Sequence, residues 1–443
     1  MKFLLRCDFR PSLNQSPRAV AGPWRGSCVV RASTSSSLQR LYLNFWPLQL
    51  NPLALVKSFH FIKPTTCVNS SRRALSNTIH TRPLPRASVT QHPIRIPNAR
   101  LATMTKPKVL QLGKIEHAHE SWSSLGTVAD IITPKSTSRP EFLQECASGA
   151  LDGVVAIYRT FSSVKITGKI DAELVAALPP SVRFICHNGA GYDQIDVAAC
   201  TQRAPTPLLV SNTPTAVDDA TADINVWLML GALRNLNASI LTLRAGKWRG
   251  SPPPALGRDP QGKVLGILGM GGIGRNMAKK ARAFGMSVRY YNRTRLSDDL
   301  EKDAGAEYVD FDTLLASSDV ISLNLPLNPH TRHIISTAEF AKMKKGVVIV
   351  NTARGAVIDE AALVDALNSG QVGSAGLDVF ENEPEVHPGL LANPNVLIVP
   401  HMGTYTLETT VKMEEWAIGN VRRAVDEGKL NSVVPEQKSV AGA

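Results

Sequence analysis

The chain has 443 residues, 43% hydrophobic content and a formal net charge of +12, which is enough to bury a large core, most readily as two domains. A balance this basic would ordinarily suggest a nucleic-acid or membrane partner. Residues 1–103, however, contain fifteen Lys and Arg and one acid, Asp8, so subtracting their +14 from +12 leaves −2 for the remainder. The near-neutral remainder argues against either partner.

Residues 1–103 form a leader that is rich in Arg, Ser and Pro and has no sustained helical or strand period. This composition resembles a mitochondrial transit sequence, and we expect the leader to be disordered. Its apolar run at 41–56 contains Pro47 and Pro52 and is too short to span a bilayer. Because Met104 opens the first clean strand, the alternative is an upstream extension absent from the mature protein. We expect a mitochondrial protein in the first case and a cytoplasmic one in the second.

Six cysteines are present, and only Cys146, Cys186 and Cys200 follow the leader. None of these forms a CxxC pair. An odd number of scattered thiols is typical of a reducing compartment. We therefore expect no metal site.

From Lys108 onward, short apolar runs alternate with helical patterns, which predicts an α/β fold with parallel sheets. In the first unit we expect strands at 108–113, 153–159, 183–189 and 207–212. A long helix is expected over 213–236, and Thr213 or Thr215 could cap its start.

A second unit follows with six apolar strands at intervals of roughly 20 to 30 residues. They are expected at 264–269, 287–292, 319–325, 346–352, 374–380 and 395–400. Their near-continuous Val, Ile and Leu content indicates burial on both faces, as in a doubly wound sheet. The last helix, 406–428, follows the complete second sheet, so we expect it to fold back onto the first unit.

The segment VLGILGMGGIG contains G-x-G-x-x-G at Gly269, Gly271 and Gly274. Alone the pattern could mark a plain turn, but here it follows an apolar strand, opens a helix and precedes a second strand, as in dinucleotide-binding units. Gly269 would permit the tight turn, Gly271 the approach of a pyrophosphate, and Gly274 close packing of helix on strand. The helix N-terminus, with Gly272 and Ile273, would supply free N–H groups.

Such units usually present an acidic side chain to the adenosine ribose at the end of the second strand. This chain instead has Asn292, followed by Arg293 and Arg295. The asparagine removes the repulsion of a 2′-phosphate, and guanidinium groups suit a phosphate dianion. We predict NADP(H) as the preferred cofactor, with NAD(H) as the alternative if the arginines are only solvated surface.

Side chains that could reduce a 2-oxo acid follow predicted strands, at the edge where such sheets bind ligands. Arg354 directly follows a buried strand, and its planar guanidinium can bind a carboxylate and a carbonyl together. His401 follows the last strand, and an imidazole can donate a proton at neutral pH. A neighbouring carboxylate would hold the imidazolium. Spacing leaves three candidates for it: Glu381, Glu383 and Glu385.

In the first unit, small residues follow the strand at 183–189. The backbone N–H groups of Asn188, Gly189 and Ala190 could bind the far side of a substrate carboxylate. The competing interpretation is a simple strand-to-helix turn.

Together these residues resemble the D-isomer-specific 2-hydroxyacid dehydrogenase family, from about residue 104 to 434. The resemblance is carried by GMGGIG, NTARGAVID, GLDVFENEP and VPHMG. It implies a Rossmann NAD(P)-binding domain of residues 213–401 and a discontinuous, flavodoxin-like substrate-binding domain of residues 104–212 and 402–436, with a cleft between them.

The resemblance also implies functional roles. It selects Glu383, directly before a proline, as the catalytic carboxylate, and it makes Arg354 the substrate anchor and His401 the proton donor. The remaining cofactor contacts that we expect are Leu325, Pro326, Thr352, Asp378 and Gly403.

Two departures from the family pattern bear on specificity. Asn292 moves the expected cofactor toward NADP, as in the glyoxylate and hydroxypyruvate reductase branch. The GTYT tail after His401 can reshape the substrate pocket, so a branched 2-oxo acid is as plausible as glyoxylate. The resemblance implies the D product and a homodimer formed through the helix at 220–236 and the loop at 246–257.

Two other groups of proteins resemble this family: co-repressors and formate dehydrogenases. Co-repressors of the C-terminal-binding-protein type resemble this family and bind dinucleotide to control assembly, without significant turnover. The arginines after Asn292 argue against them. Formate dehydrogenases resemble a pattern with Gln in the acid position, which Glu383 disfavours.

Overall fold

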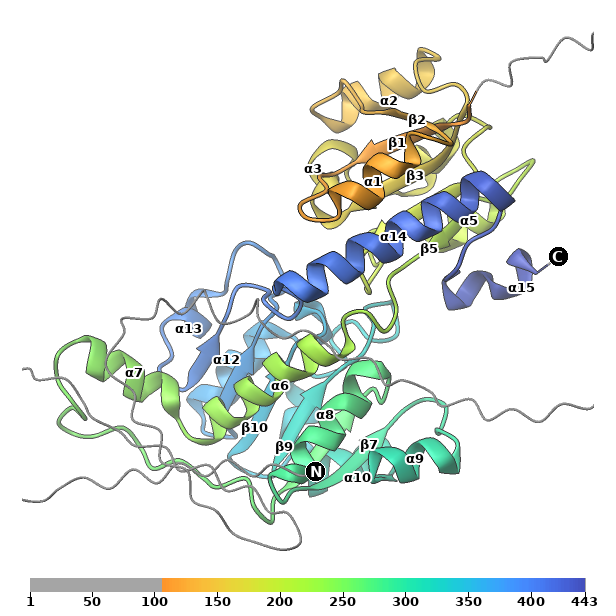
Figure 1. Cartoon of the computed structure of the whole chain (residues 1–443). Helices are drawn as coiled ribbons and strands as arrows, with labels where there is room; N and C mark the ends of the chain where they lie inside the picture. The colour runs from red at the N-terminus through yellow and green to blue at the C-terminus, as the bar shows by residue number, and fades with distance from the viewer. Residues whose placement is uncertain (1–105, 443) are drawn as a thin grey trace, which may run out of the picture. The chain divides into compact units, whose positions relative to one another are not determined.

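The computed structural model describes residues 106–442 (Figure 1). The disordered leader predicted over 1–103 lies outside the described residues. Within 106–442 the chain forms two sheets, and every strand pair in them is parallel. The predicted α/β class with two parallel sheets is therefore confirmed.

The first sheet has five strands in the order β2-β1-β3-β4-β5, which is the flavodoxin-like order. The strands are β1 (Lys108–Leu112), β2 (Asp130–Ile132), β3 (Val154–Thr160), β4 (Phe184–Asn188) and β5 (Leu209–Ser211). The helices between them are α1 (His119–Leu125), α2 (Arg139–Ala147), α3 (Val164–Thr167), α4 (Ala172–Ala177) and α5 (Val197–Gln202). The edge strand β2 was not predicted, because it has no buried residue and does not lie in a long apolar run.

The second sheet has seven strands in the order β12-β11-β10-β9-β6-β7-β8, a Rossmann order with one strand added at the β12 edge. The strands are β6 (Val264–Leu268), β7 (Ser287–Tyr291), β8 (Ala306–Tyr308), β9 (Val320–Leu323), β10 (Val347–Asn351), β11 (Val372–Leu377) and β12 (Val396–Ile398). The helices between them are α8 (Gly272–Ala283), α9 (Asp298–Ala304), α10 (Phe311–Ser317), α11 (Thr337–Lys342), α12 (Glu360–Asn368) and α13 (Pro388–Leu391).

The helix predicted over 213–236 begins later than expected, as α6 (Asp218–Leu233), and α7 (Leu236–Arg244) follows it. Its N-cap is Val217, which makes no side-chain capping bond. The predicted cap at Thr213 or Thr215 is therefore wrong. Thr215 takes a left-handed backbone conformation, with φ of 63°, so the chain turns there before the helix can start.

Among residues 106–442 no single helix has both the length and the apolar composition to cross a membrane, although α6 and α7 taken together, bent by 76°, reach both.

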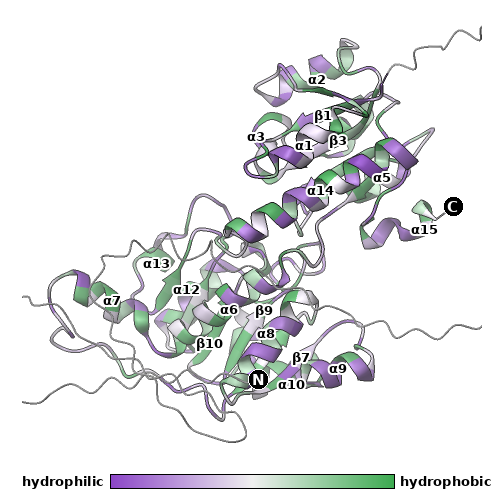
Figure 2. Cartoon of the chain, in the orientation of Figure 1, coloured by the Kyte–Doolittle hydropathy of each residue, from purple (hydrophilic) through white to green (hydrophobic). Residues whose placement is uncertain are grey.

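Helices cover both faces of each sheet, as the apolar strands predict. In the second sheet α6 and α8 pack on one face, while α10, α11 and α12 pack on the other. In the first sheet α2, α4 and α5 oppose α1 and the long α14 (Leu407–Glu427). Figure 2 shows apolar residues along the strands and alternating polar and apolar residues along α14. The final helix thus packs on the first sheet, as expected for a discontinuous domain, while the exact domain boundaries stay a prediction.

A buried carboxylate fastens α14 to the beginning of the fold. Glu414 is only 1% exposed, and its oxygens accept the backbone N–H groups of Glu116, His117 and Ala118 at 2.6, 2.9 and 2.7 Å. These donors precede α1, and without the carboxylate the N–H of the buried Ala118 would lack a partner. One side chain therefore joins segments that lie almost 300 residues apart.

Replacing Glu414 by Gln should lower the free energy of unfolding by about 2–4 kcal/mol, because the amide turns a donor toward buried donors and loses the charge-assisted bonds. Urea unfolding measures the change. Glu415→Gln is the matched control, because Glu415 is exposed and its replacement should change stability by less than about 0.5 kcal/mol. Equal stabilities of the two variants would contradict this role of Glu414.

Candidate active site

The glycine loop between β6 and α8 has the form that the sequence predicts. Gly269 has a φ of +99°, and a Cβ there would press on the carbonyl of Asn324. A Cβ on Gly274 would overlap the carbonyl of Gly269, whereas one on Gly271 would meet open space. The loop therefore turns sharply, packs its helix closely and leaves room beside Gly271 at the N-terminus of α8. This geometry fits a dinucleotide pyrophosphate.

At the end of β7, the Oδ1 atom of Asn292 accepts the backbone N–H of Met270 at 2.7 Å, so the asparagine is tied to the glycine loop. Arg295 forms a bidentate ion pair with Glu301, with both bonds at 2.7 Å, and lies over the ring of Tyr308. Arg293 is exposed, and among the described residues it makes no hydrogen bond or ion pair. The two arginines predicted to bind a phosphate therefore differ. Arg295 is paired with the carboxylate of Glu301, whereas Arg293 is free to bind a ligand.

An acidic side chain that the sequence prediction did not assign to the cofactor site lies beside the glycine loop. The carboxylate of Asp218, at the start of α6, packs so closely on Gly272 that a Cβ there would overlap it. Burial raises the pKa of Asp218; the positive charge of Arg275 opposes this shift and the negative charge of Asp219 adds to it. The carboxylate of Asp218 therefore lies at the N-terminus of α8, where the helix dipole favours negative charge.

The three candidate glutamates have different partners, and only one of them contacts His401. The Oε2 atom of Glu383 lies 2.9 Å from Nδ1 of His401, and its Oε1 atom accepts the N–H of Phe380 at 3.0 Å. Glu381 instead lies 2.6 Å from Nε2 of His333. Glu385 makes no side-chain hydrogen bond or ion pair within the described part of the chain. The geometry therefore singles out Glu383.

The electrostatics of Glu383 link the pair to Arg354. Burial acts to raise the pKa of Glu383, but the hydrogen bond and charge of His401, the bond from Phe380 and the charge of Arg354 together lower it below its usual value. The carboxylate is therefore ionised at neutral pH. The charge of Arg354 is the smallest of these influences, and among the described residues no hydrogen bond or ion pair joins Arg354 to Glu383 or His401.

The loop that carries His401 is fixed by hydrogen bonds to Asp378, a residue that is only 1% exposed. The carboxylate of Asp378 accepts the N–H groups of Met402 and Gly403. Burial raises the pKa of Asp378, although these bonds and the charge of His401 oppose the shift. His401 itself has a φ of 56°, a conformation that costs free energy unless the surroundings impose it. In this structure Asp378 supports the histidine loop, and its predicted position near the cofactor stays a prediction.

Arg354 follows β10 and reaches the loop after β4. Its Nε atom donates to Oδ1 of Asp193 at 2.7 Å, and its Nη1 atom donates to the carbonyl of Ala353 at 2.7 Å. A Cβ on Gly191 would overlap Nη2, so only glycine lets the loop pack on the guanidinium. The predicted substrate anchor is thus already fixed from two sides.

The predicted carboxylate-binding backbone lies next to this anchor. The carbonyl oxygen of Ala190 accepts a bond from the side chain of Asn212 at 2.8 Å, and that of Gly189 accepts the N–H of Thr213. Within the described residues the N–H groups of Gly189 and Ala190 make no loop hydrogen bond, so they remain available to an anion. Asn188, by contrast, uses its side chain to bond the hydroxyl of Tyr158 at 3.0 Å.

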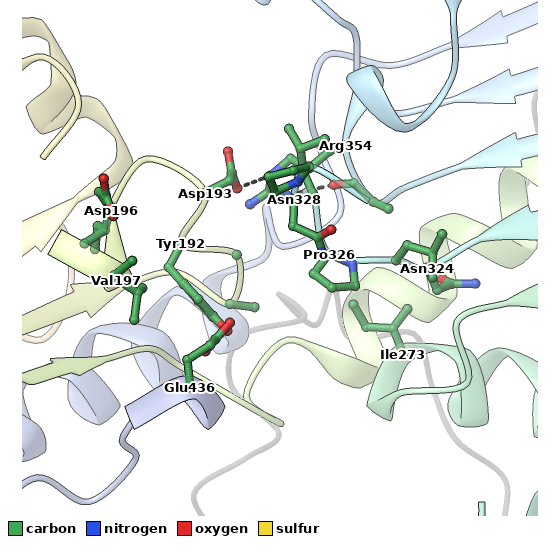
Figure 3. Close-up of a pocket in the computed structure, with 18 of the residues that line it drawn as sticks. Tyr192, Asp193, Asp196, Val197, Ile273, Asn324, Pro326, Asn328, Arg354 and Glu436 are labelled. Carbon is green, nitrogen blue, oxygen red and sulfur yellow. Dashed lines mark hydrogen bonds and ion pairs between the residues drawn. The ribbon is translucent and has the colours of Figure 1, made fainter. Parts of the chain in front are cut away.

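A cavity of about 690 Å³ lies between the glycine-loop region and the loop after β4 (Figure 3). Its lining includes six of the predicted residues: Ala190, Ile273, Leu325, Pro326, Thr352 and Arg354. The hydroxyl of Thr352 is buried without a hydrogen-bond partner, which suits a polar group of a bound cofactor. His401 and Glu383 do not line this cavity.

Within residues 106–442 no group of three or more His, Cys, Asp or Glu side chains is arranged to hold a metal ion. The three cysteines in that range are free and buried.

Comparison with known proteins agrees with this geometry. Residues 226–403 match the D-isomer specific 2-hydroxyacid dehydrogenase, NAD binding domain. The chain is 56% identical over 334 residues to 4-methyl-2-oxopentanoate reductase A of Aspergillus oryzae, covering 75% of this chain and 99% of that protein. The chain belongs to the D-isomer specific 2-hydroxyacid dehydrogenase family.

Solved structures of family members have the same fold. The glyoxylate reductase of Paecilomyes thermophila is 54% identical, with a TM-score of 0.73 over 76% of this chain and all of that one. The NADPH-dependent glyoxylate/hydroxypyruvate reductase of Sinorhizobium meliloti, solved with NADP and malonate, is 28% identical, with a TM-score of 0.64 over 75% of this chain and 98% of that one.

Three acidic residues near the site were not predicted from the sequence: Asp193, Asp218 and Glu436. Glu436 lies on the 3₁₀ helix η4 (Pro435–Gln437) and lines the cavity together with Asp193. Asp193 lies in the GAGYDQID segment, three residues after the predicted carboxylate-binding loop, and its charge was the available signal. For Asp218 and Glu436 no local signal existed, because only tertiary packing brings them to the cleft.

Replacing Asp218 by Asn should stabilise the protein at pH 7. The folded pKa of this acid is raised above its unfolded value, so its contribution to stability is full below the unfolded pKa and is lost as pH rises through the folded pKa. The neutral amide avoids that loss, and its advantage should shrink as pH falls toward about 3.9, the ordinary Asp value. Urea unfolding at several pH values measures this difference. An advantage of Asp218→Asn that does not depend on pH would rule out titration as its cause.

Proposed function

We propose that this protein is an NADPH-preferring reductase that converts a small 2-oxo acid into the corresponding D-2-hydroxy acid. The observation that carries the proposal is the Glu383–His401 pair, in which a carboxylate oxygen lies 2.9 Å from a ring nitrogen, at the edge of the same sheet where Arg354 follows β10. A cation for a carboxylate and a proton donor for an alkoxide are the two groups that such a reduction requires. The reductases of 4-methyl-2-oxopentanoate and of glyoxylate among its relatives support this substrate class.

The residues divide the chemistry between them. The nicotinamide, when bound, supplies the hydride for C2 of the oxo acid. Arg354 binds the substrate carboxylate, and the free backbone N–H groups of Gly189 and Ala190 approach it from the other domain. Glu383 engages Nδ1 of His401, which leaves Nε2 as the ring nitrogen that gives its proton to the developing alkoxide. The ionised carboxylate of Glu383 fixes the ring and balances its charge while it is protonated.

His401→Ala should lower kcat by roughly 10²–10⁴, the usual size of general acid catalysis. The assay follows NADPH oxidation with 4-methyl-2-oxopentanoate, hydroxypyruvate or glyoxylate. His119→Ala, at an exposed histidine on α1, is the control and should keep full activity. A loss of less than about fivefold for His401→Ala would contradict its role. Wild-type protein that binds NADPH but turns over none of these acids would favour a dinucleotide-sensing binding protein instead.

The preference for NADPH rests on Asn292 and on the availability of Arg293. The amide of Asn292 carries no charge that would repel a 2′-phosphate, and Arg293 is exposed beside it. Arg295 is paired with Glu301, so we assign it to holding the loop in shape and assign the phosphate to Arg293. The NADPH-dependent relative solved with NADP supports the same preference.

Arg293→Ala should lower kcat/KM for NADPH by about tenfold and leave that for NADH almost unchanged, because only the first cofactor carries the phosphate. The ratio of the two kcat/KM values is the measurement. Arg295→Ala serves as the comparison and should change this ratio less. A clear preference of the wild-type enzyme for NADH would contradict the assignment of NADPH as the cofactor. A ratio of kcat/KM values that Arg293→Ala leaves unchanged would contradict the assignment of the phosphate to Arg293.

We also propose a homodimer formed through α6, α7 and the loop after them. Large apolar side chains in this segment are exposed to solvent: Trp227, Leu236, Ile240, Leu241, Leu243, Trp248 and Leu256. A contiguous segment with so much exposed apolar surface is typical of a protein interface. Four of these side chains fall within the predicted 220–236 and 246–257, and the other three lie on α7 between those ranges. Sedimentation of the purified protein measures the assembly directly.

The leader composition supports import into the mitochondrion, and the alternative is a cytoplasmic enzyme that starts near Met104. The N-terminus of the mature protein distinguishes these locations. The charge of −2 outside the leader supports a small-molecule enzyme without a nucleic-acid or membrane partner.

A further inference from the structure

Asp193, on the loop between β4 and α5, makes an ion pair with Arg354, which follows β10 of the second sheet. The two side chains are only 20% and 22% exposed, so water screens their interaction less than it would on an open surface. Both line the cavity, where they face each other (Figure 3). The pair therefore joins the predicted substrate-binding loop to the predicted substrate anchor.

The guanidinium of Arg354 is held at two of its three nitrogens. Nε donates to Asp193 and Nη1 donates to the carbonyl of Ala353, each at 2.7 Å. Nη2 makes no hydrogen bond to any described residue and lies against Gly191. A guanidinium fixed in this way cannot rotate without breaking a charge-assisted bond. Its remaining N–H donors are thus kept in one orientation before any ligand arrives.

We infer that Asp193 is a positioning residue for the substrate anchor: it holds Arg354 so that Nη2 is presented to the carboxylate of the 2-oxo acid. The inference rests on the proposed function, because it concerns how the same site binds its substrate. The GAGYDQID segment would then orient Arg354 through Asp193, in addition to offering backbone N–H groups to the substrate carboxylate.

The negative charge of Asp193 would repel an anionic substrate unless positive charges nearby offset it, and two arginines supply such charges. Burial acts to raise the pKa of Asp193, but the charge and hydrogen bond of Arg354 lower it below its usual value, so the group is ionised at neutral pH. A second guanidinium, Arg159 on β3, is fully buried and bonds to Gln194 and Ser163. Burial lowers the pKa of Arg159 to about 10, which leaves it charged at neutral pH.

His187 adds no charge to this group. Burial, together with the charge of Arg159, lowers the pKa of His187 to about 3, so its neutral ring donates from Nε2 to the carbonyl of Gly191 at 2.9 Å. Arg354 therefore binds the carboxylate of Asp193 directly, whereas Arg159 interacts with it only through its charge. The two guanidinium groups carry one positive charge more than this single carboxylate, and that surplus matches the single negative charge of the substrate carboxylate.

The alternative is that Asp193 competes with the substrate for Arg354 and must be displaced by it. The two roles predict opposite effects of removing the carboxylate. A positioning residue weakens substrate binding when it is lost, because Arg354 becomes free to turn. A competitor strengthens substrate binding when it is lost, because Arg354 then has no other anion.

Two variants separate these roles in the enzyme with saturating NADPH. Asp193→Ala should raise KM for 4-methyl-2-oxopentanoate and lower kcat/KM about 10- to 100-fold, with KM for NADPH unchanged. Asp193→Asn keeps an oxygen that can accept the Nε–H bond and should stay within about fivefold of the wild type. A lower KM in Asp193→Ala, or an equal loss in both variants, would overturn the inference.

Asp171→Ala is the matched control. Asp171 binds Arg139 at 2.7 Å in the same domain and does not line the cavity. Its loss should lower the melting temperature and leave KM for the oxo acid unchanged. A rise in KM equal to that of Asp193→Ala would show that general loss of stability explains the effect, and it would overturn the inference.

A binding measurement separates this inference from the proposed function. Calorimetric titration of the NADPH complex with oxamate, an unreactive analogue of a 2-oxo acid, should give about 10- to 100-fold weaker binding for Asp193→Ala and nearly unchanged binding for Asp193→Asn. If the wild type binds oxamate without turning over any oxo acid, the proposed reaction fails while the positioning role is still tested. Failure of the wild type to bind oxamate would overturn both.

Discussion

The geometry of the site depends on one constraint: all strands of a parallel sheet end at the same edge. Arg354 follows β10, Asp378 follows β11 and His401 follows β12, and these three strands are neighbours in the second sheet. Residues separated by almost fifty positions in the chain are therefore brought to the same edge of the sheet, where the backbone N–H of His401 donates to the carbonyl of Asp378 at 2.8 Å. The hydrogen bonds of Asp378 and Glu383 then fix orientations that the sheet alone leaves free.

Charge is distributed in this cleft so that few ionised groups lack a partner. Glu383 is paired with His401, Asp193 with Arg354, and Arg295 with Glu301. Two guanidinium groups are exceptions. Arg159 is buried and has one nitrogen without a partner among the described residues, although it does not line the cavity. Arg293 is exposed beside the predicted ribose site, where the phosphate of a phosphorylated cofactor would give it a partner.

Most of the fold could be predicted from the sequence, because buried parallel strands are continuous apolar runs. The strands that were not predicted, β2 and β8, contain no buried residue. The equally short β5 and β12 were predicted, because each has buried apolar residues within a longer apolar run. The start of α6 was misplaced because the left-handed turn at Thr215 reflects tertiary packing and leaves no local signal. Arg354, Glu383 and His401 were found because each directly follows a strand or belongs to a specific motif.

The partners of those residues were harder to predict, since they depend on contacts across the fold. Glu301 lies only six positions from Arg295, yet nothing in the intervening sequence indicates that it captures that arginine. Asp193 reaches Arg354 over 161 positions, and only the packing of Gly191 against the guanidinium makes the approach feasible. Motifs therefore identify the groups predicted to perform the chemistry. The residues that orient those groups are recognised only from the contacts between the loops that line the cavity. Specificity for one 2-oxo acid should be sought in the same kind of residue, around the guanidinium and the histidine loop.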